Sequence, residues 1–203
     1  RATVTNREFL YRSAFELGRH LIGYELQKVL AGVDWFVKET GQPPAKIGVM
    51  GWGEGGMLAL YAAALDPRID AVCVSGHFDS RQDIWQQPLD RNVFGLLEQF
   101  GDAELASLIA PRPLIVEACR GPELELPSKG GAPARLVTPP LASVQAEAAR
   151  AEESARMKID LIAVDGGNGP FGSDQALQRL LQTLGLDLRA AAPGPLERLR
   201  TAF

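Results

Sequence analysis

The sequence is poor in the residues that build metal sites and disulfide frameworks, because its 203 residues include only two histidines and two cysteines. Both cysteines, Cys73 and Cys119, lie in or beside apolar runs, so we expect buried thiols rather than a disulfide. We expect no metal site and no cofactor. No apolar run approaches the roughly 18 residues of a membrane span. The net charge is −4 and no long basic block occurs, so we expect neither nucleic acid nor a membrane as a partner.

The composition is otherwise that of an ordinary globular protein, with 46% hydrophobic and 23% charged residues. A chain of this length suffices for one sizeable domain with a buried core. We expect that domain over residues 1–186 and a loosely held tail over residues 187–203. The first residues show no secretory pattern of basic start, apolar middle and small-residue cleavage site, and the sequence indicates no compartment.

The rest of the chain is organised around the segment from Lys46 to Leu65, KIGVMGWGEGGMLALYAAAL. A short apolar run meets a glycine cluster, and a long alanine- and leucine-rich stretch follows, which is typical of strand, tight turn and helix. Only glycine tolerates positive φ freely, so four glycines in six residues predict a sharp turn with closely packed backbones. These are Gly51, Gly53, Gly55 and Gly56.

Such a turn has three interpretations. In the nucleophile elbow, G-x-S-x-G, a strained corner lifts a nucleophile above the sheet, and the nucleophile position here is Gly53. In the dinucleotide fingerprint, G-x-G-x-x-G, the glycines would be Gly51, Gly53 and Gly56. That fingerprint requires an acidic residue at the end of the next strand, whereas none occurs there before Asp79. The third interpretation is a tight turn without chemistry.

Strand-like and helix-like segments alternate along the chain, which predicts an α/β protein with a mostly parallel sheet. The first helical segment, residues 7–39, contains Gly18 and Gly23, so we expect a break near one of them. The four expected strands are residues 47–50, 69–75, 113–119 and 159–164. Further helices are expected over residues 91–100, over 102–109 with Asp102 as N-cap, over 139–157, and from the N-cap Ser173 onward, while residues 121–140 are expected to form a loop.

Ligands of parallel sheets gather at the carboxyl ends of the strands, and four side chains at that edge are candidates for a pocket: Trp52, Glu54, His77 and Phe171. Trp52 and Phe171 either line a pocket or pack locally. Glu54 is expected to stabilise the positive end of the following helix. For His77 we expect a hydrogen-bonding surface residue, with an unorthodox base or ligand as the alternative.

Several motifs resemble the α/β-hydrolase superfamily, and within it the branch of dienelactone hydrolases and acetyl xylan esterases. They are VDWF (33–36), KIGVMGWGEGG (46–56), DPRIDAVCVSG (66–76), GDAELASLIAPRPLIVE (101–117) and GGNGPF (166–171). The resemblance implies the C-terminal part of a three-layer sandwich with a mostly parallel sheet. It also implies that the strands upstream of the elbow are absent from this chain, which would leave the strand at 47–50 with an unpaired edge.

In that family a nucleophile, a histidine base and an acid act as a unit. Carried over by position, the nucleophile is Gly53, the base is Asn168 and the acid is Glu123. Glycine has no side chain, and an asparagine amide cannot act as a base near neutral pH. The two histidines, His20 and His77, both precede the third expected strand. The resemblance therefore implies that no catalytic set is intact and that these three positions are vestigial.

Two hypotheses of function follow. The first is a hydrolase-like domain that has lost catalysis and serves as a binding or structural module of a longer protein. The second is part of an active carboxylester hydrolase whose site is completed by upstream residues or a sister domain. The expected partners are the upstream part of the same protein and a small-molecule or carbohydrate ester ligand. If the elbow is kept, serine at Gly53 is expected to fit better than side chains at Gly55 or Gly56.

Overall fold

The computed structural model describes residues 4–40, 45–126 and 131–186, so the expected tail at 187–203 lies outside the described residues. The helices are α1 (Asn6–Glu16), α2 (Leu21–Glu39), α3 (Glu54–Leu65), α4 (Asp102–Ile109), α5 (Leu141–Ala155) and α6 (Asp174–Thr183). The strands are β1 (Ile47–Trp52), β2 (Ile69–Ser75), β3 (Leu114–Ala118), β4 (Leu124–Leu126), β5 (Ala134–Leu136) and β6 (Asp160–Ala163). Short 3-10 turns are η1 (Ile84–Gln86), η2 (Leu89–Arg91), η3 (Leu96–Glu98) and η4 (Asp165–Gly167).

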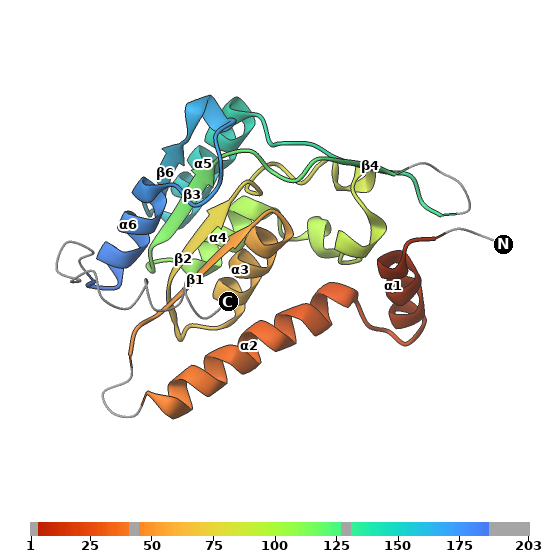
Figure 1. Cartoon of the computed structure of the whole chain (residues 1–203), viewed down its shortest axis with the longest axis horizontal. Coiled ribbons are helices and arrows are strands. Elements are labelled where there is room, and N and C mark those ends of the chain that lie inside the picture. The colour runs from red at the N-terminus through yellow and green to blue at the C-terminus, as the bar shows by residue number, and fades with distance from the viewer. Residues whose placement is uncertain (1–3, 41–44, 127–130, 187–203) are drawn as a thin grey trace, which may run out of the picture.

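A four-stranded parallel sheet forms the centre of the molecule, in the order β1-β2-β3-β6 (Figure 1). Successive strands of the sheet are joined through helices, as parallel pairing requires. The predicted α/β class with a parallel sheet is therefore confirmed. Within the described residues β1 is the last strand on its side of the sheet, which agrees with the expected unpaired edge at residues 47–50.

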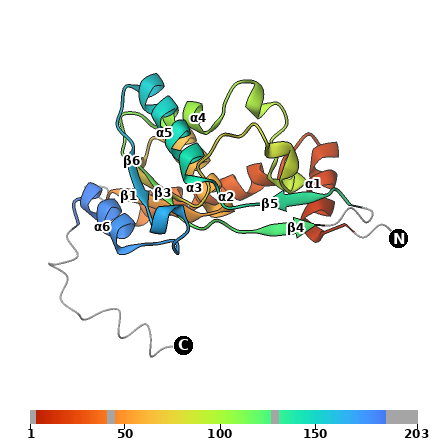
Figure 2. The ribbon, with the colours of Figure 1, turned by 90° about the horizontal axis from the view of Figure 1, so that it is seen from above.

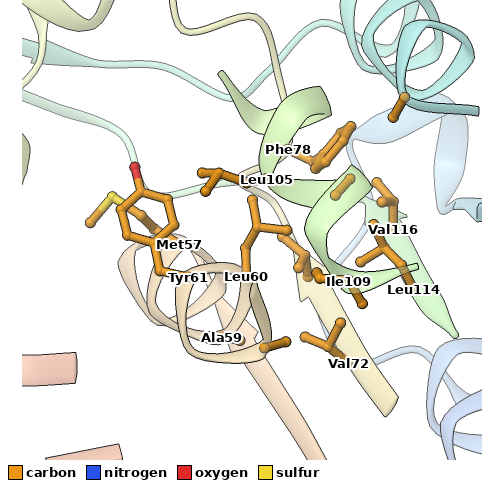
Figure 3. Close-up of a cluster of buried hydrophobic side chains, with 14 of the residues drawn as sticks. Met57, Ala59, Leu60, Tyr61, Val72, Phe78, Leu105, Ile109, Leu114 and Val116 are labelled. Atoms are coloured by element: carbon orange, nitrogen blue, oxygen red, sulfur yellow. The ribbon is translucent and has the colours of Figure 1, made fainter. Parts of the chain in front are cut away.

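Each central strand buries side chains on both faces, which explains its continuous apolar sequence. One face, with Val72 and Val116, packs against α3 and α4 (Figure 3). The other face, with Cys73 and Ile115, packs against Leu180 of α6. Helices α4 and α5 thus lie on one side of the sheet and α6 on the other (Figure 2). This arrangement is a three-layer sandwich.

Helix α3 is buried over most of its length, and its small side chains allow close packing on β1 and β2. The C-terminal end of α3 is capped by the side chain of Arg112, which the sequence pattern did not indicate. The guanidinium of Arg112 donates hydrogen bonds to the carbonyl oxygens of Ala63 (2.7 Å), Asp66 (3.0 Å) and Ile69 (2.8 Å). A cation at a helix C-terminus satisfies free carbonyl groups and interacts favourably with the helix dipole.

Several local predictions hold and others are wrong. The first helical segment breaks as expected, between α1 and α2, where Gly18 has a φ of 70°, and Ser173 caps α6 by accepting a hydrogen bond from Ala176 N. The N-cap of α4 is Gly101 and not Asp102, which is buried as the first helical residue. Residues 91–100 contain the short 3-10 turn η3 (Leu96–Glu98) instead of an α-helix. Helix α5 begins at Leu141, and part of the expected loop forms the hairpin β4–β5.

No helix among the described residues is long and apolar enough to cross a membrane. The same residues contain no group of three or more histidine, cysteine, aspartate or glutamate side chains that could hold a metal ion.

Candidate functional site

The turn from β1 to α3 has the sharp geometry of an elbow. Gly53 stands between strand and helix with φ 55° and ψ −116°, a strained conformation that L-residues rarely adopt. Its N–H donates to the carbonyl of Ser75 in β2 (2.9 Å), and its carbonyl accepts from Met57 N in α3 (3.1 Å). At Gly51 an added Cβ would lie 2.0 Å from the carbonyl oxygen of Gly55. The corner therefore requires glycine at Gly51 for space, and it favours glycine at Gly53 because of its φ.

The space above Gly53 is filled by the ring of Pro122, from the loop after β3. A Cβ added at Gly53 would lie 2.7 Å from both Cγ and Cδ of that ring. By contrast, a Cβ added at Gly55 meets no atom within 4 Å, and one at Gly56 lies 3.1 Å from His77 Cβ. The expectation that serine fits at Gly53 better than side chains fit at Gly55 is therefore wrong. The space next to Gly53, the residue matched to the nucleophile, is occupied by a proline from another loop.

The loops after β1, β3 and β6 meet at the carboxyl edge of the sheet. Trp52 Nε1 donates to the carbonyl of Arg120 (2.7 Å), and the N–H of Arg120 donates to the carbonyl of Gly169 (2.8 Å). The rings of Trp52 and Phe171 stack with their centroids 5.1 Å apart. Both rings are partly exposed. Trp52 and Phe171 therefore pack against each other instead of lining a pocket.

The positions matched to the acid and the base are both exposed. The carboxylate of Glu123 accepts a hydrogen bond from Thr138 Oγ1 (2.9 Å), which joins the two ends of the segment that carries β4 and β5. Asn168 follows η4, and its N–H donates to the carbonyl of Asp165 (3.2 Å). Among the described residues no hydrogen bond joins the side chains of Glu123 and Asn168 to each other. These two side chains and Gly53 do not form a connected catalytic set.

Glu54, the first residue of α3, belongs to a cluster centred on Arg7 of α1. The guanidinium of Arg7 binds the carboxylates of Glu25 (2.8 Å), Glu54 (2.5 Å) and Asp90 (2.6 Å). Burial raises the pKa of Glu54, and the nearby charge of Arg7 opposes this effect. Glu54 lies at the helix end where it was expected, and its carboxylate also ties α1 to the elbow.

His77, directly after β2 and Gly76, is buried, with a side chain only 1% exposed. The expectation that it lies at the surface is therefore wrong. Its Nδ1 lies 3.4 Å from a guanidinium nitrogen of Arg91, and its Nε2 lies 3.6 Å from Asp102 Oδ2. Burial, together with the charges of Arg81 and Arg91, lowers the pKa of His77 well below 6.5. The imidazole is consequently neutral at physiological pH.

Asp102 is the buried carboxylate of this cluster. Its Oδ2 pairs with Arg81 Nε (3.2 Å) and accepts from Asp79 N (3.1 Å). Burial raises the pKa of Asp102 to about 6, although the charge of Arg81 opposes the shift. Three buried atoms of the cluster have no hydrogen-bond partner among the described residues: His77 Nε2, Arg91 Nε and Asp102 Oδ1. Sequence analysis named His77 and Asp102 but not their association, and it missed Arg81 and Arg91, which lie in the irregular stretch between β2 and α4.

A cavity of about 330 Å³ opens next to this cluster. Its wall includes His77, Arg81, Arg91, Pro122 and Arg135, so it adjoins the elbow through Pro122. Of the four predicted pocket residues, only His77 lines it; Trp52, Glu54 and Phe171 do not. A larger and mainly apolar groove of about 700 Å³ lies elsewhere, between α2, α3 and α4.

Glu117, near the C-terminal end of β3, is another buried carboxylate whose role sequence analysis missed. It accepts hydrogen bonds from Gly172 N (2.9 Å), Ser173 N (2.8 Å) and Ser173 Oγ (2.6 Å). Burial alone would raise its pKa, but the hydrogen bonds from Ser173, Ser75 and the backbone outweigh it, so that the pKa is lowered. A lone glutamate inside the apolar run PLIVEAC was the available signal, because a buried carboxylate requires partners.

Comparison with known proteins supports the fold. No family model matches the chain. The chain is similar to the "Putative hydrolase YtaP" of Bacillus subtilis (strain 168), with 33% identity over 111 residues, which cover 51% of this chain and 37% of that protein. Among solved structures, it is similar to a "putative acetyl xylan esterase" from Bacteroides fragilis NCTC 9343, with a TM-score of 0.53, 15% identity and coverage of 97% of this chain and 52% of the other. It is also similar to a glucuronoyl esterase from Solibacter usitatus, with a TM-score of 0.54, 13% identity and coverage of 81% and 48%.

These likenesses show a hydrolase- or esterase-like α/β fold, as the motifs implied. The chain spans about half the length of the two solved structures, and the match spans 37% of the curated relative. At such low identity the structural neighbours establish the fold of the chain and not its reaction.

Proposed function

We propose that this chain is a hydrolase-fold domain that has lost the hydrolytic reaction and serves as a binding or structural module of a longer protein. One observation carries the proposal: the elbow has glycine at the nucleophile position, and the ring of Pro122 fills the space that a nucleophile would need. Acyl transfer at an elbow requires a side chain that forms a covalent bond with the acyl carbon. Gly53 has none, and the ring of Pro122 lies against the place that the Cβ of a nucleophile would take.

The surroundings of the elbow support the same function. The base position, Asn168, is exposed and carries an amide that cannot accept a proton near neutral pH. The acid position, Glu123, is bound to Thr138 and has no histidine to orient. The two histidines are used elsewhere: His20 Nε2 accepts from Phe94 N (3.0 Å), and His77 is buried and neutral. A general base that activates a hydroxyl must lie within hydrogen-bond reach of it.

The test is ester turnover by the purified chain. We expect p-nitrophenyl acetate to be hydrolysed no faster than by a heat-denatured control, and a fluorophosphonate probe to label no serine. Weak turnover is expected only in the triple variant Gly53→Ser, Pro122→Ala, Asn168→His. The serine and the histidine supply the missing nucleophile and base, and Pro122→Ala removes the ring atoms that would contact the new serine. Members of such a triad act as a unit, so Gly53→Ser alone should remain inactive. Stoichiometric labelling of a serine in the unaltered chain would refute the proposal.

The second candidate function is part of an active carboxylester hydrolase whose site is completed by other residues of the same protein. It is favoured by the share of the solved esterase that this chain covers, about half, and by the free edge of β1 in the described sheet. A further strand from the same protein would pair with that edge, and the upstream part of the protein is the partner we propose for it.

The two candidates are separated by assaying the longer protein with short-chain acyl esters. Turnover that disappears on Asn168→Ala or Glu123→Gln, with the folded state preserved, would establish the second candidate and refute the first. We also expect residues 1–203 alone to self-associate in sedimentation velocity as concentration rises, and to become monomeric when upstream residues are present. A monomer at every concentration without them would contradict the proposed pairing of β1.

A further inference from the structure

We propose that the cavity beside the elbow binds the carboxylate group of a small molecule, with Arg91 as its principal partner. The inference rests on the proposed function, in which the domain binds a ligand without hydrolysing it, and it adds the chemical class of that ligand.

Arg91 is a buried cation whose hydrogen-bonding capacity is incompletely used. The residue is 4% exposed, and in the part of the chain that the structure describes its Nε has no hydrogen-bond partner. Its contact with His77 Nδ1 is long, at 3.4 Å. The neighbouring carboxylates of Glu54 and Asp90 are both bound to Arg7. A buried donor without a partner is destabilising, and a carboxylate in the adjoining cavity would add its charge to those of Glu54 and Asp90, which already act on Arg91.

The cavity provides the room for such an acceptor. Its volume of about 330 Å³ lies at the small end of the range of ligand sites, roughly 300–1,000 Å³. Arg81, on the same wall, already binds Asp102 (3.2 Å) and the carbonyl of His77 (2.6 Å). Arg91 is therefore the buried arginine of the wall that is available to a ligand, while the exposed Arg135 lies at the rim.

The charges of the wall favour a monoanion. Arg81, Arg91 and Arg135 line the wall together with Asp79 and Asp83, and Arg81 is paired with the buried Asp102, so the wall has no large excess of positive charge that a dianion would need. His77 adds none, because its imidazole is neutral. A carboxylate carries one negative charge, whereas a phosphate monoester carries nearly two near neutral pH. The planar fork of a guanidinium also matches the two oxygens of a carboxylate.

Small aromatic probes test this assignment directly in the full 203-residue chain. Titration calorimetry should detect binding of benzoate, at least about tenfold weaker binding of the neutral isostere benzamide, and weaker binding of inorganic phosphate than of benzoate. Arg91→Gln should lower the benzoate affinity at least about tenfold, and Arg91→Lys, which keeps the charge but loses the fork, should lower it less.

Because Arg91 is buried, its replacement could also unfold the chain, so Arg135→Gln at the exposed rim is a second variant. It should weaken benzoate binding severalfold with an unchanged circular dichroism spectrum. The matched control is Arg19→Gln, an exposed arginine outside the cavity, which should bind benzoate like the unaltered chain.

Equal binding of benzoate and benzamide, tighter binding of phosphate, or an equal loss in Arg19→Gln would each overturn the assignment, as would the absence of benzoate binding. None of these outcomes bears on ester turnover, so the proposed loss of hydrolysis would stand. Conversely, turnover by the unaltered chain would refute the proposed function even if benzoate binds.

Discussion

The contact between Gly53 and Pro122 gives the sharpest prediction about the elbow. Gly53→Ser introduces a Cβ 2.7 Å from two atoms of the proline ring, at a residue whose φ is 55°. A side chain at such a φ costs about 1–3 kcal/mol, and overpacking of a filled space costs about 1–3 kcal/mol more. We therefore expect Gly53→Ser to lower the free energy of unfolding by about 2–6 kcal/mol.

Gly55→Ser is the matched control, because it adds the same atoms two residues further along the chain. A Cβ at Gly55 meets nothing within 4 Å, and its φ lies outside the positive range. Glycine is also a poorer helix former than other residues, so the free energy of unfolding should change by less than about 1 kcal/mol. Urea denaturation followed by circular dichroism measures both variants.

A double-mutant cycle with Pro122→Ala separates the two contributions to the loss. Alanine removes the Cγ and Cδ atoms that the new Cβ would meet, so in this background only the cost of the positive φ remains. The loss of stability in the double variant should be about 1–3 kcal/mol smaller than the sum of the losses in the two single variants. Equal losses in Gly53→Ser and Gly55→Ser, or a coupling near zero, would show that Pro122 does not occupy the nucleophile space in solution.

Two further predictions concern the buried ionisable groups. Burial lowers the pKa of His77 in the folded chain, so below pH 6.5 the unfolded chain protonates His77 and the folded chain does not. The stability contributed by this group is therefore lost as the pH falls. Asp102, whose folded pKa is raised to about 6, acts in the opposite sense. His77→Gln should therefore become more stable relative to the unaltered chain as the pH falls from 6.5, by up to about 1.4 kcal/mol per pH unit in urea titrations, and a difference independent of pH would refute this. Glu117→Gln places an amide where three donors point, and should lower the free energy of unfolding by about 2–4 kcal/mol. The control is Glu123→Gln at an exposed position, which should change the free energy of unfolding by less than about 0.5 kcal/mol. Equal effects of the two substitutions would contradict a structural role for Glu117.

The sequence predicted those parts of the fold that depend on local pattern. The range of β2 was predicted to the residue, and the break at Gly18 and the cap at Ser173 were also predicted, because apolar runs, positive φ and capping residues act over a few positions. The site depended on contacts between distant residues. Pro122 lies 69 positions after Gly53, and Asp102 lies 25 positions after His77, so no spacing rule could bring these pairs together.

The position of Pro122 also links the elbow to the cavity, because the same ring meets Gly53 and forms part of the wall near Arg91. A side chain at Gly53 must displace the ring by several tenths of an ångström at the least, since a Cβ cannot stay 2.7 Å from carbon atoms. Displacement of a wall residue changes the shape of a small site, so Gly53→Ser should weaken benzoate binding severalfold. Gly55→Ser, whose Cβ meets no neighbouring atom within 4 Å, should leave that binding unchanged, and calorimetry on the two variants decides the matter. If benzoate binds both variants alike, Pro122 moves without altering the cavity, and the elbow and the cavity beside it are independent.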